Sequence, residues 1–114
     1  MRANLGGGVG HVESRARRDG CRLQSPPYKD DKPGVERSGC FSYFNDSKLG
    51  VTLNLKHPQG RALALRLVDR ADIVIENMRP GVMARLGLAP EILRERNPRV
   101  IVLSTTNMGQ SGPF

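Results

Sequence analysis

The sequence predicts an α/β fold built around a parallel β-sheet. From Val51 onward, short runs rich in β-branched residues alternate with helix-like segments, an order that implies parallel strands joined by crossover helices. Prolines stand where two of those helices would begin, a position at which the missing N–H costs nothing. The chain has 114 residues, which is enough for one domain and too few for two. We therefore expect residues 1–114 to be one domain or part of a larger one.

The first part of the chain predicts little regular structure. Residues 1–14 read as a frayed helix end, a glycine turn and a short strand around Val9 to Glu13. The glycines do not complete a dinucleotide-binding GxGxxG motif, because His11 stands where close helix packing needs the third glycine. Residues 15–40 are charged and rich in proline and glycine, so they predict a surface loop within the domain.

The second part predicts alternating strands and helices. Residues 51–55 alternate apolar and polar side chains, as a half-buried strand does. The helix after Pro58 has an apolar stripe that includes Leu67, predicted to face the sheet. Residues 72–76 and 100–104 predict two buried strands. A short helix near residues 82–86 and another opened by Pro90 lie between these strands.

The polar segments that follow the last two strands are the predicted binding loops. In open α/β sheets, ligands bind beyond the carboxyl ends of the strands, here at residues 76–81 and 105–112. Asn77 can donate and accept hydrogen bonds beside main-chain N–H groups at a helix opening, or it can simply cap that helix. Arg79 and Arg85 are candidate phosphate partners. Spacing alone does not decide between these roles.

No residue type in the chain makes a convincing catalytic group. Ser104, Thr105 and Thr106 lack the GxSxG turn of a nucleophile, and both histidines are far away in the sequence. Asp72 begins a predicted strand and would lie at the wrong edge of the sheet. We therefore expect no catalytic residue here.

Composition argues against several other classes of protein. The net charge of +7 is spread along the chain, and aromatic residues are only 4%, which disfavours a base-stacking surface. Cys21 and Cys40 have no metal-ligand spacing, so we expect no metal site; free thiols are expected, and a single disulfide remains open. No signal peptide or membrane span is evident, which favours the cytoplasm.

A set of short strings in one order resembles a known family. These strings are NxxK, LNLK, ADIVIEN, RPG, RLGL, NPR and GQSGP, within residues 45–113. In this order they resemble the N-terminal part of the large domain of family III coenzyme A transferases. That group includes formyl-CoA and carnitine CoA-transferases and α-methylacyl-CoA racemase. The similarity extends back to about Leu5.

The resemblance implies a fold, a ligand and a partner. It implies part of a Rossmann-like sheet with flanking helices, truncated at both ends, in an enzyme that moves coenzyme A between carboxylic acids. Such enzymes work as interlinked homodimers on acyl-CoA and carboxylate substrates, without a metal. Loops matching residues 53–56, residues 77–79 and one later arginine would hold the adenine and phosphates. The implied coenzyme A-binding set is Leu53, Asn54, Leu55, Lys56, Asn77, Met78, Arg79 and Arg85.

The sequence also departs from the family pattern in several places. The usual first strand would precede Met1, and Ser14 occupies a position where some relatives have a coenzyme-binding arginine. The nucleophilic aspartate that forms the covalent intermediate would lie beyond Phe114. We therefore expect this chain by itself to be catalytically silent.

Two other interpretations remain open at this point. One is a basic α/β module that binds nucleic acid or a protein partner through the arginines of residues 15–22. The other is a gene remnant without a function. The acyl group, and the choice between transferase and racemase chemistry, lie outside what the sequence indicates.

Overall fold

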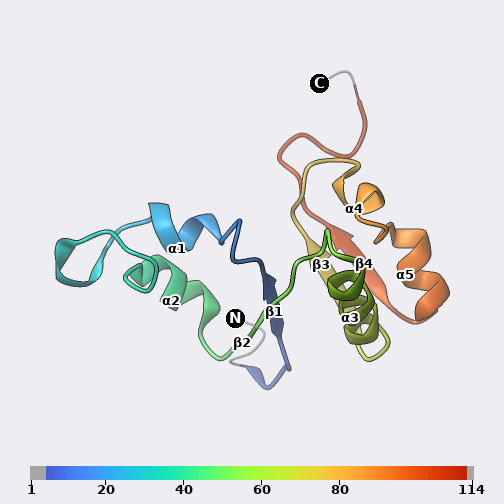
Figure 1. The fold of residues 1–114 in the computed structure, drawn as a ribbon, viewed down its shortest axis with the longest axis horizontal. Coiled ribbons are helices and arrows are strands. Elements are labelled where there is room, and N and C mark those ends of the chain that lie inside the picture. Colours follow the sequence, from blue (N-terminus) through green and yellow to red (C-terminus); the bar gives the residue numbers. More distant parts are fainter. Residues whose placement is uncertain (1–4, 113–114) are drawn as a thin grey trace. The chain divides into compact units, whose positions relative to one another are not determined.

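The computed structural model describes residues 5–112 and confirms the predicted α/β class. Helices alternate with two separate pairs of parallel strands (Figure 1). The chain divides into two compact units between Leu53 and Asn54, and each unit contains one strand pair. The helix end expected at residues 1–4 lies outside the described residues. Each unit is therefore described by itself.

The first unit contains strands β1 (Gly10–Glu13) and β2 (Leu49–Thr52), paired in parallel. Strand β1 confirms the strand predicted around Val9 to Glu13. Strand β2 begins two residues before the predicted start at Val51 and ends at Thr52. The Leu53 N–H still donates to the Glu13 carbonyl at 3.0 Å. The residues that follow Leu53 form a turn, so the apolar alternation predicted a longer strand than exists.

The segment expected to be a loop, residues 15–40, contains short helices. These are α1 (Gly20–Gln24), the 3₁₀ helix η2 (Lys29–Asp31) and the first residues of α2 (Gly39–Asn45). The Asp19 carboxylate accepts from the Cys21 N–H at 2.9 Å, and the Ser38 hydroxyl accepts from the Phe41 N–H at 3.2 Å. Both are N-caps, which satisfy free backbone donors at a helix start. The prolines lie between the helices, so they separate regular elements and do not exclude them.

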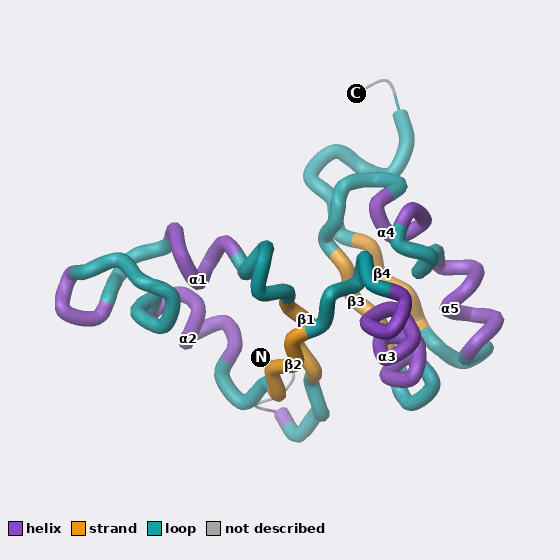
Figure 2. The backbone as a smooth tube through the Cα atoms, in the orientation of Figure 1, coloured by secondary structure: helices purple, strands orange, loops and turns teal. Residues whose placement is uncertain are grey.

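The second unit follows the predicted order of elements. It contains α3 (Pro58–Val68), β3 (Ile73–Glu76), α4 (Val82–Arg85), α5 (Pro90–Arg96) and β4 (Ile101–Ser104). Strands β3 and β4 are parallel neighbours, with Ile73 opposite Ile101 and Glu76 opposite Ser104 (Figure 2). Helices α3 and α5 begin at the two prolines that predicted them.

The core of the second unit lies between this strand pair and helices α3 and α5. Its buried members are Val68, Leu88, Leu93 and Val100, and the side chains packed against them are Leu55, Ala64, Leu65, Ala71, Val74, Met83, Leu86 and Val102. On α3, Ala64 and Val68 share one helical face and meet the core, as does Ala71 beyond the end of the helix. Leu67 lies on a neighbouring face and is 50% exposed, so the prediction that it faces the sheet is wrong.

Among the described residues of the second unit, the helices cover one face of the β3–β4 pair. Val74 and Val102 point to the core, whereas Ile75, Ile101 and Leu103 on the alternate face are 64%, 61% and 49% exposed. The prediction of strands buried on both faces is therefore wrong for this structure. An apolar run cannot reveal which face has a partner, because a continuous run gives both faces the same composition.

Polar contacts join the ends of α3 and α5. The Asn97 side-chain amide donates to the Val68 and Ala71 carbonyls, both at 2.9 Å. The Arg96 guanidinium donates to both carboxylate oxygens of Asp69, at 2.8 and 2.5 Å. The two Asn97 hydrogen bonds satisfy carbonyl groups at and just beyond the end of α3. They hold the amino-terminal ends of β3 and β4 together, opposite the edge where a ligand is expected.

Candidate functional site

The carboxyl ends of β3 and β4 lie side by side at one edge of the strand pair. Strand β3 ends at Glu76 and β4 at Ser104, and these two residues are register partners. The Thr105 N–H donates to the Glu76 carbonyl at 2.8 Å, and the Thr105 hydroxyl donates to the same oxygen at 3.3 Å. The two polar turns therefore start next to each other, as the sequence predicted.

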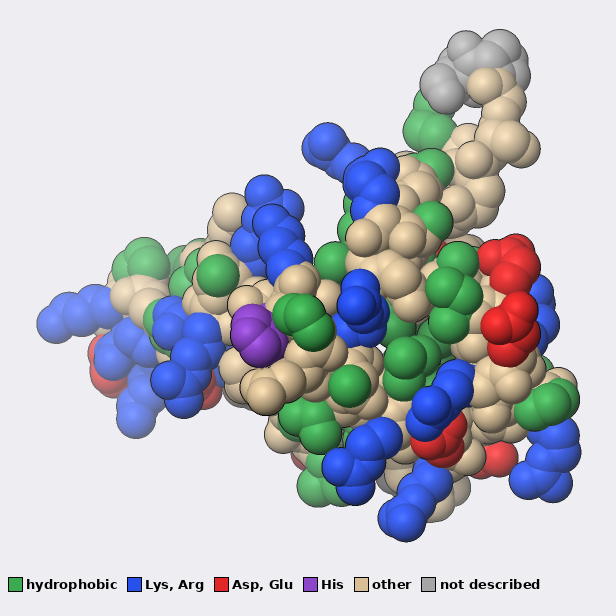
Figure 3. Space-filling model, turned by 45° about the vertical axis from the view of Figure 1, so that its right-hand side comes forward, with side chains coloured by type: hydrophobic (Ala, Val, Ile, Leu, Met, Phe, Trp, Pro, Cys, Tyr) green, Lys and Arg blue, Asp and Glu red, His purple; other side chains and the backbone are tan. Residues whose placement is uncertain are grey.

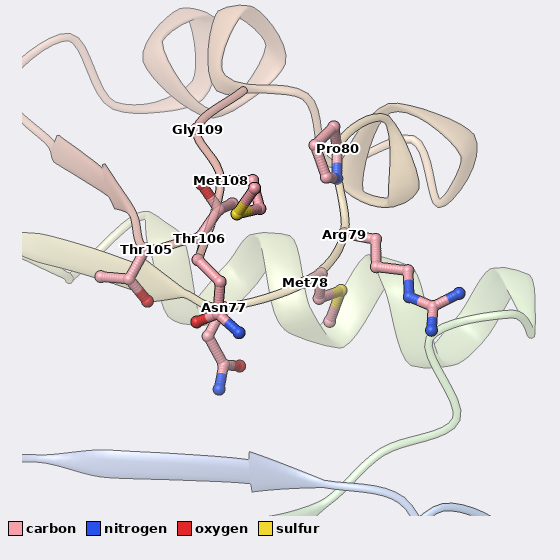
Figure 4. Close-up of a pocket in the computed structure, with 9 residues that line it drawn as sticks. Asn77, Met78, Arg79, Pro80, Thr105, Thr106, Met108 and Gly109 are labelled. Atoms are coloured by element: carbon pink, nitrogen blue, oxygen red, sulfur yellow. The ribbon is translucent and has the colours of Figure 1, made fainter. Parts of the chain in front are cut away.

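An open cavity of about 580 Å³ lies between these two turns. Figure 4 shows that all of its lining residues come from the segments that directly follow β3 and β4. They are Asn77, Met78, Arg79, Pro80, Thr105, Thr106, Asn107, Met108 and Gly109. Ligand sites in proteins commonly occupy about 300 to 1,000 Å³ and combine apolar walls with a few polar groups. The cavity has the size of such a site, and its lining is more polar than usual, with Met78, Pro80 and Met108 as its apolar residues.

Asn77 does not cap the following helix. Helix α4 has Gly81 as its N-cap, with a left-handed φ of 78°, and no side chain caps it. Asn77 is exposed and lines the cavity, and its binding role stays a prediction. The N–H groups expected to face an anion are partly occupied, however. The Met78 N–H donates to a Glu76 carboxylate oxygen at 2.8 Å, and the Val82 N–H donates to the Arg79 carbonyl at 3.1 Å.

The two candidate arginines lie in different places. Arg79 is exposed and lines both the main cavity and a smaller one of about 90 Å³. In Figure 4 its side chain extends away from the turn that contains Thr106 and Gly109. Arg85 lines neither cavity; one of its guanidinium nitrogens would lie 3.4 Å from a Cβ added at Gly81. It therefore lies over the start of α4.

The other predicted segment, residues 53–56, forms the approach to α3. The Asn54 side chain accepts from the Lys56 N–H at 3.1 Å, and the Asn54 carbonyl accepts from the His57 N–H at 3.0 Å. Leu53 is buried at the end of the first unit, Leu55 packs against the core of the second, and Lys56 is exposed. None of the four lines either cavity. Their contacts with a ligand stay a prediction.

The sequence indicated the second turn as a segment but not its individual residues. Thr106, Asn107 and Met108 line the cavity and were absent from the predicted ligand contacts. These residues could have been predicted as ligand contacts, because ligands bind beyond the carboxyl ends of neighbouring parallel strands and all three residues follow such a strand. No histidine or aspartate lines either cavity. The expectation that Ser104, Thr105 and Thr106 are not activated nucleophiles stays a prediction.

The arginines of the first unit are only partly available to a polyanion. Arg22 forms ion pairs with Glu13 at 3.1 Å and Glu36 at 2.7 Å, and its guanidinium lies 3.7 Å from the centre of the Phe41 ring. Burial would raise the pKa of Glu13, but the Asp19 N–H and Arg22 together lower it below its usual value. Within each unit, Figure 3 shows Lys and Arg side chains at separate points among apolar ones.

Neither a metal-binding cluster nor a membrane-spanning helix is found in the part of the chain that the structure describes. Within residues 5–112, no group of three or more His, Cys, Asp or Glu side chains is placed to hold a metal ion. In the same part of the chain, no helix has the length and apolar character needed to cross a bilayer.

Comparison with known proteins gives one family. The family model described as CoA-transferase family III matches residues 1–114. Succinate–glutarate CoA-transferase from Agrobacterium fabrum is 38% identical over all of this chain, which covers 29% of that protein. Human alpha-methylacyl-CoA racemase is 44% identical over 74% of this chain and 22% of its own length. The chain thus spans less than a third of these relatives.

Solved structures give the same result. A Mycobacterium tuberculosis protein titled as hypothetical protein Rv3272 aligns with a TM-score of 0.77 and 37% identity, over 93% of this chain and 27% of its own. A CAIB/BAIF family protein from Brucella suis aligns with a TM-score of 0.75 and 37% identity, over 93% and 28%. The fold and the sequence therefore agree on the relatives.

Proposed function

The chain belongs to CoA-transferase family III, and from that premise we propose that the cavity between its two turns binds part of coenzyme A. One observation carries the proposal. Two neighbouring parallel strands end at the same edge, and the turns that leave them enclose an open cavity of about 580 Å³. That is where open α/β sheets bind nucleotide-like ligands.

The residues of the two turns divide the binding between them. Asn77 and Asn107 supply side-chain amides, which can donate to and accept from an adenine or pantetheine group. Arg79 supplies a positive charge for a phosphate, and a charge-assisted hydrogen bond is stronger than a neutral one. Met78 and Met108 supply adaptable apolar surface. Lys56 and Arg85 reach phosphate groups that extend beyond the cavity, with residues 53–55 providing main-chain and apolar contacts.

The chemistry of transfer needs a group that these cavities do not present. Attack on a thioester requires a nucleophile, and the lining residues include one acidic side chain, Glu76. Its carboxylate already accepts the Met78 N–H. We infer that the chain by itself binds coenzyme A without transferring it. For the active enzyme of this family we propose a catalytic aspartate, a carboxylic acid site, an interlinked homodimer and a cytoplasmic location.

A calorimetric titration of the chain with coenzyme A tests the proposal. We expect one saturable site. Replacing Arg79 with Ala should weaken binding about ten-fold, which corresponds to the loss of one partly solvated charge-assisted hydrogen bond. Arg94 on α5 is a matched control, because it is exposed and lines neither cavity. Its replacement with Ala should leave the affinity unchanged.

Two results would contradict the proposal. The first is equal weakening by the two arginine substitutions, which would indicate attraction by net charge alone. The second is no heat of binding to coenzyme A together with salt-sensitive binding to random-sequence DNA, which would favour the basic binding module. In either case the cavity would have no special role.

A further inference from the structure

The two cysteines of the first unit lie against each other although they are far apart in the sequence. Cys21 is on α1 and Cys40 is on α2, two helices that pack side by side (Figures 1 and 2). The two side chains are close enough for Cys40 to raise the pKa of the Cys21 thiol. The structure thus brings together the two thiols between which the sequence left a single disulfide open.

The residues that follow each cysteine also contact one another. The guanidinium of Arg22 lies 3.7 Å from the centre of the Phe41 ring. This cation–π contact joins the helix position after Cys21 to the helix position after Cys40. Since Arg22 also pairs with Glu13 on β1 at 3.1 Å, its side chain is held in place from two sides.

Further contacts fix the start of α2 against the segment that leaves α1. The Ser38 hydroxyl is buried and donates to the Ser25 carbonyl at 2.7 Å. The Gly39 N–H donates to the Pro27 carbonyl at 2.8 Å. A Cβ added at Gly39 would lie 3.2 Å from the Pro27 ring, so the two segments touch without a gap. Contacts on both sides of the cysteines therefore hold the thiols together.

Both thiols can be reached by a small reagent. Cys21 and Cys40 are half-buried and free. The hydrogen bond to Cys40, then burial and the nearby Asp19 carboxylate, raise the pKa of the Cys21 thiol. A thiol reacts as its thiolate, so the raised pKa disfavours Cys21 as the first attacking thiol and suits it to the resolving role.

We propose that Cys21 and Cys40 are a reversible dithiol–disulfide pair that closes on reaction with a low-molecular-weight disulfide. The Cys40 thiolate attacks one sulfur of the reagent, forms a mixed disulfide and releases one thiolate. Cys21 loses its proton to solvent and attacks the Cys40 sulfur, which releases the second thiolate. Two protein thiols are oxidised to one disulfide, and one reagent disulfide is reduced to two thiols. The bond would lock α1 to α2.

Oxidised glutathione at neutral pH, added to the full chain, tests the proposal by mass spectrometry and thiol titration. We expect the wild-type chain to lose both thiols and about 2 Da, and to retain no glutathione. Peptide mapping should find Cys21 joined to Cys40 within one chain. Each single variant, Cys21→Ser and Cys40→Ser, should instead keep one glutathione per chain, because the resolving thiol is missing.

A second test compares the wild-type chain in buffer with the same chain in concentrated urea. The equilibrium constant for closing the bond against glutathione should be at least about ten-fold larger in buffer than in concentrated urea, because the folded unit already holds the thiols together. Equal constants in the two solvents would overturn the proposal. So would a wild-type chain that retains two glutathiones, or one that forms the bond between two chains.

Discussion

Replacing Gly60 with Ala should destabilise the second unit by about 2 kcal/mol. Gly60 is buried in the first turn of α3, against the turn that carries Asn54 and Lys56. An added Cβ would lie 2.1 Å from the Asn54 carbonyl oxygen, 2.8 Å from its carbon and 3.3 Å from the Asn54 nitrogen. All three are backbone atoms, so no side-chain rotation relieves the clash, and the turn must move by more than about 1 Å.

The magnitude is the balance of two terms. Overpacking a tight site costs about 1 to 3 kcal/mol, and a clash with backbone falls at the upper end. Alanine recovers about 1 kcal/mol, because glycine is the poorer helix former. The net loss of about 2 kcal/mol would appear as a lower urea midpoint with an unchanged slope. If residues 53–56 contact coenzyme A, the affinity should also fall.

Gly20, at the start of α1, is the control for this substitution. The nearest atom to a Cβ added there is 4.0 Å away. The Gly20→Ala variant should therefore be as stable as the wild type, or more stable by up to about 1 kcal/mol. If Gly60→Ala is equally stable, the close approach of Asn54 to α3 does not exist in solution and our reasoning about this turn fails.

The remaining predictions concern the core and the helix ends of the second unit. Leu93 is 1% exposed, so Leu93→Ala should cost about 2 to 5 kcal/mol in urea unfolding, whereas the half-exposed Leu67→Ala should cost about 1 kcal/mol or less. Equal losses would contradict the observed core. Asn97→Ala removes two side-chain hydrogen bonds and should cost about 1 to 3 kcal/mol in the same assay; a loss below about 0.5 kcal/mol would mean that water replaces them. Asp69 has its pKa lowered, chiefly by the hydrogen bond from Arg96, so its contribution is present above the unfolded pKa and is lost as pH falls through the folded one. Melting curves below pH 4 should therefore converge for the wild type and Asp69→Asn, and a gap that widens on acidification would contradict this sign.

The second unit could be predicted from its sequence because local signals and the fold agree there. Pro58 and Pro90 stand at the first positions of α3 and α5, and β-branched runs form β3 and β4. Parallel pairing then follows from the intervening helices and brings the two polar turns to one edge. The location of the cavity was therefore accessible from residue order alone.

The short helices of the first unit and the contact between its cysteines could not be predicted from the sequence. Asp19 and Ser38 cap short helices, but such residues are equally common in turns, and the nearby prolines favoured a loop. The contact between Cys21 and Cys40 depends on how α1 and α2 pack, which no local pattern contains. In the second unit, the exposure of Leu67 depends on which helix face meets the core, and positions 63 and 67 match helical spacing as well as positions 64 and 68 do.

The most direct test of the coenzyme A-binding edge is an amide NMR titration of the chain with coenzyme A. Both turns contribute to the cavity, so the amides of residues 77–79 and 81 and those of residues 105–109 should shift together and saturate at the same ligand concentration. Shifts confined to one turn, or absent from both while other residues respond, would contradict the account.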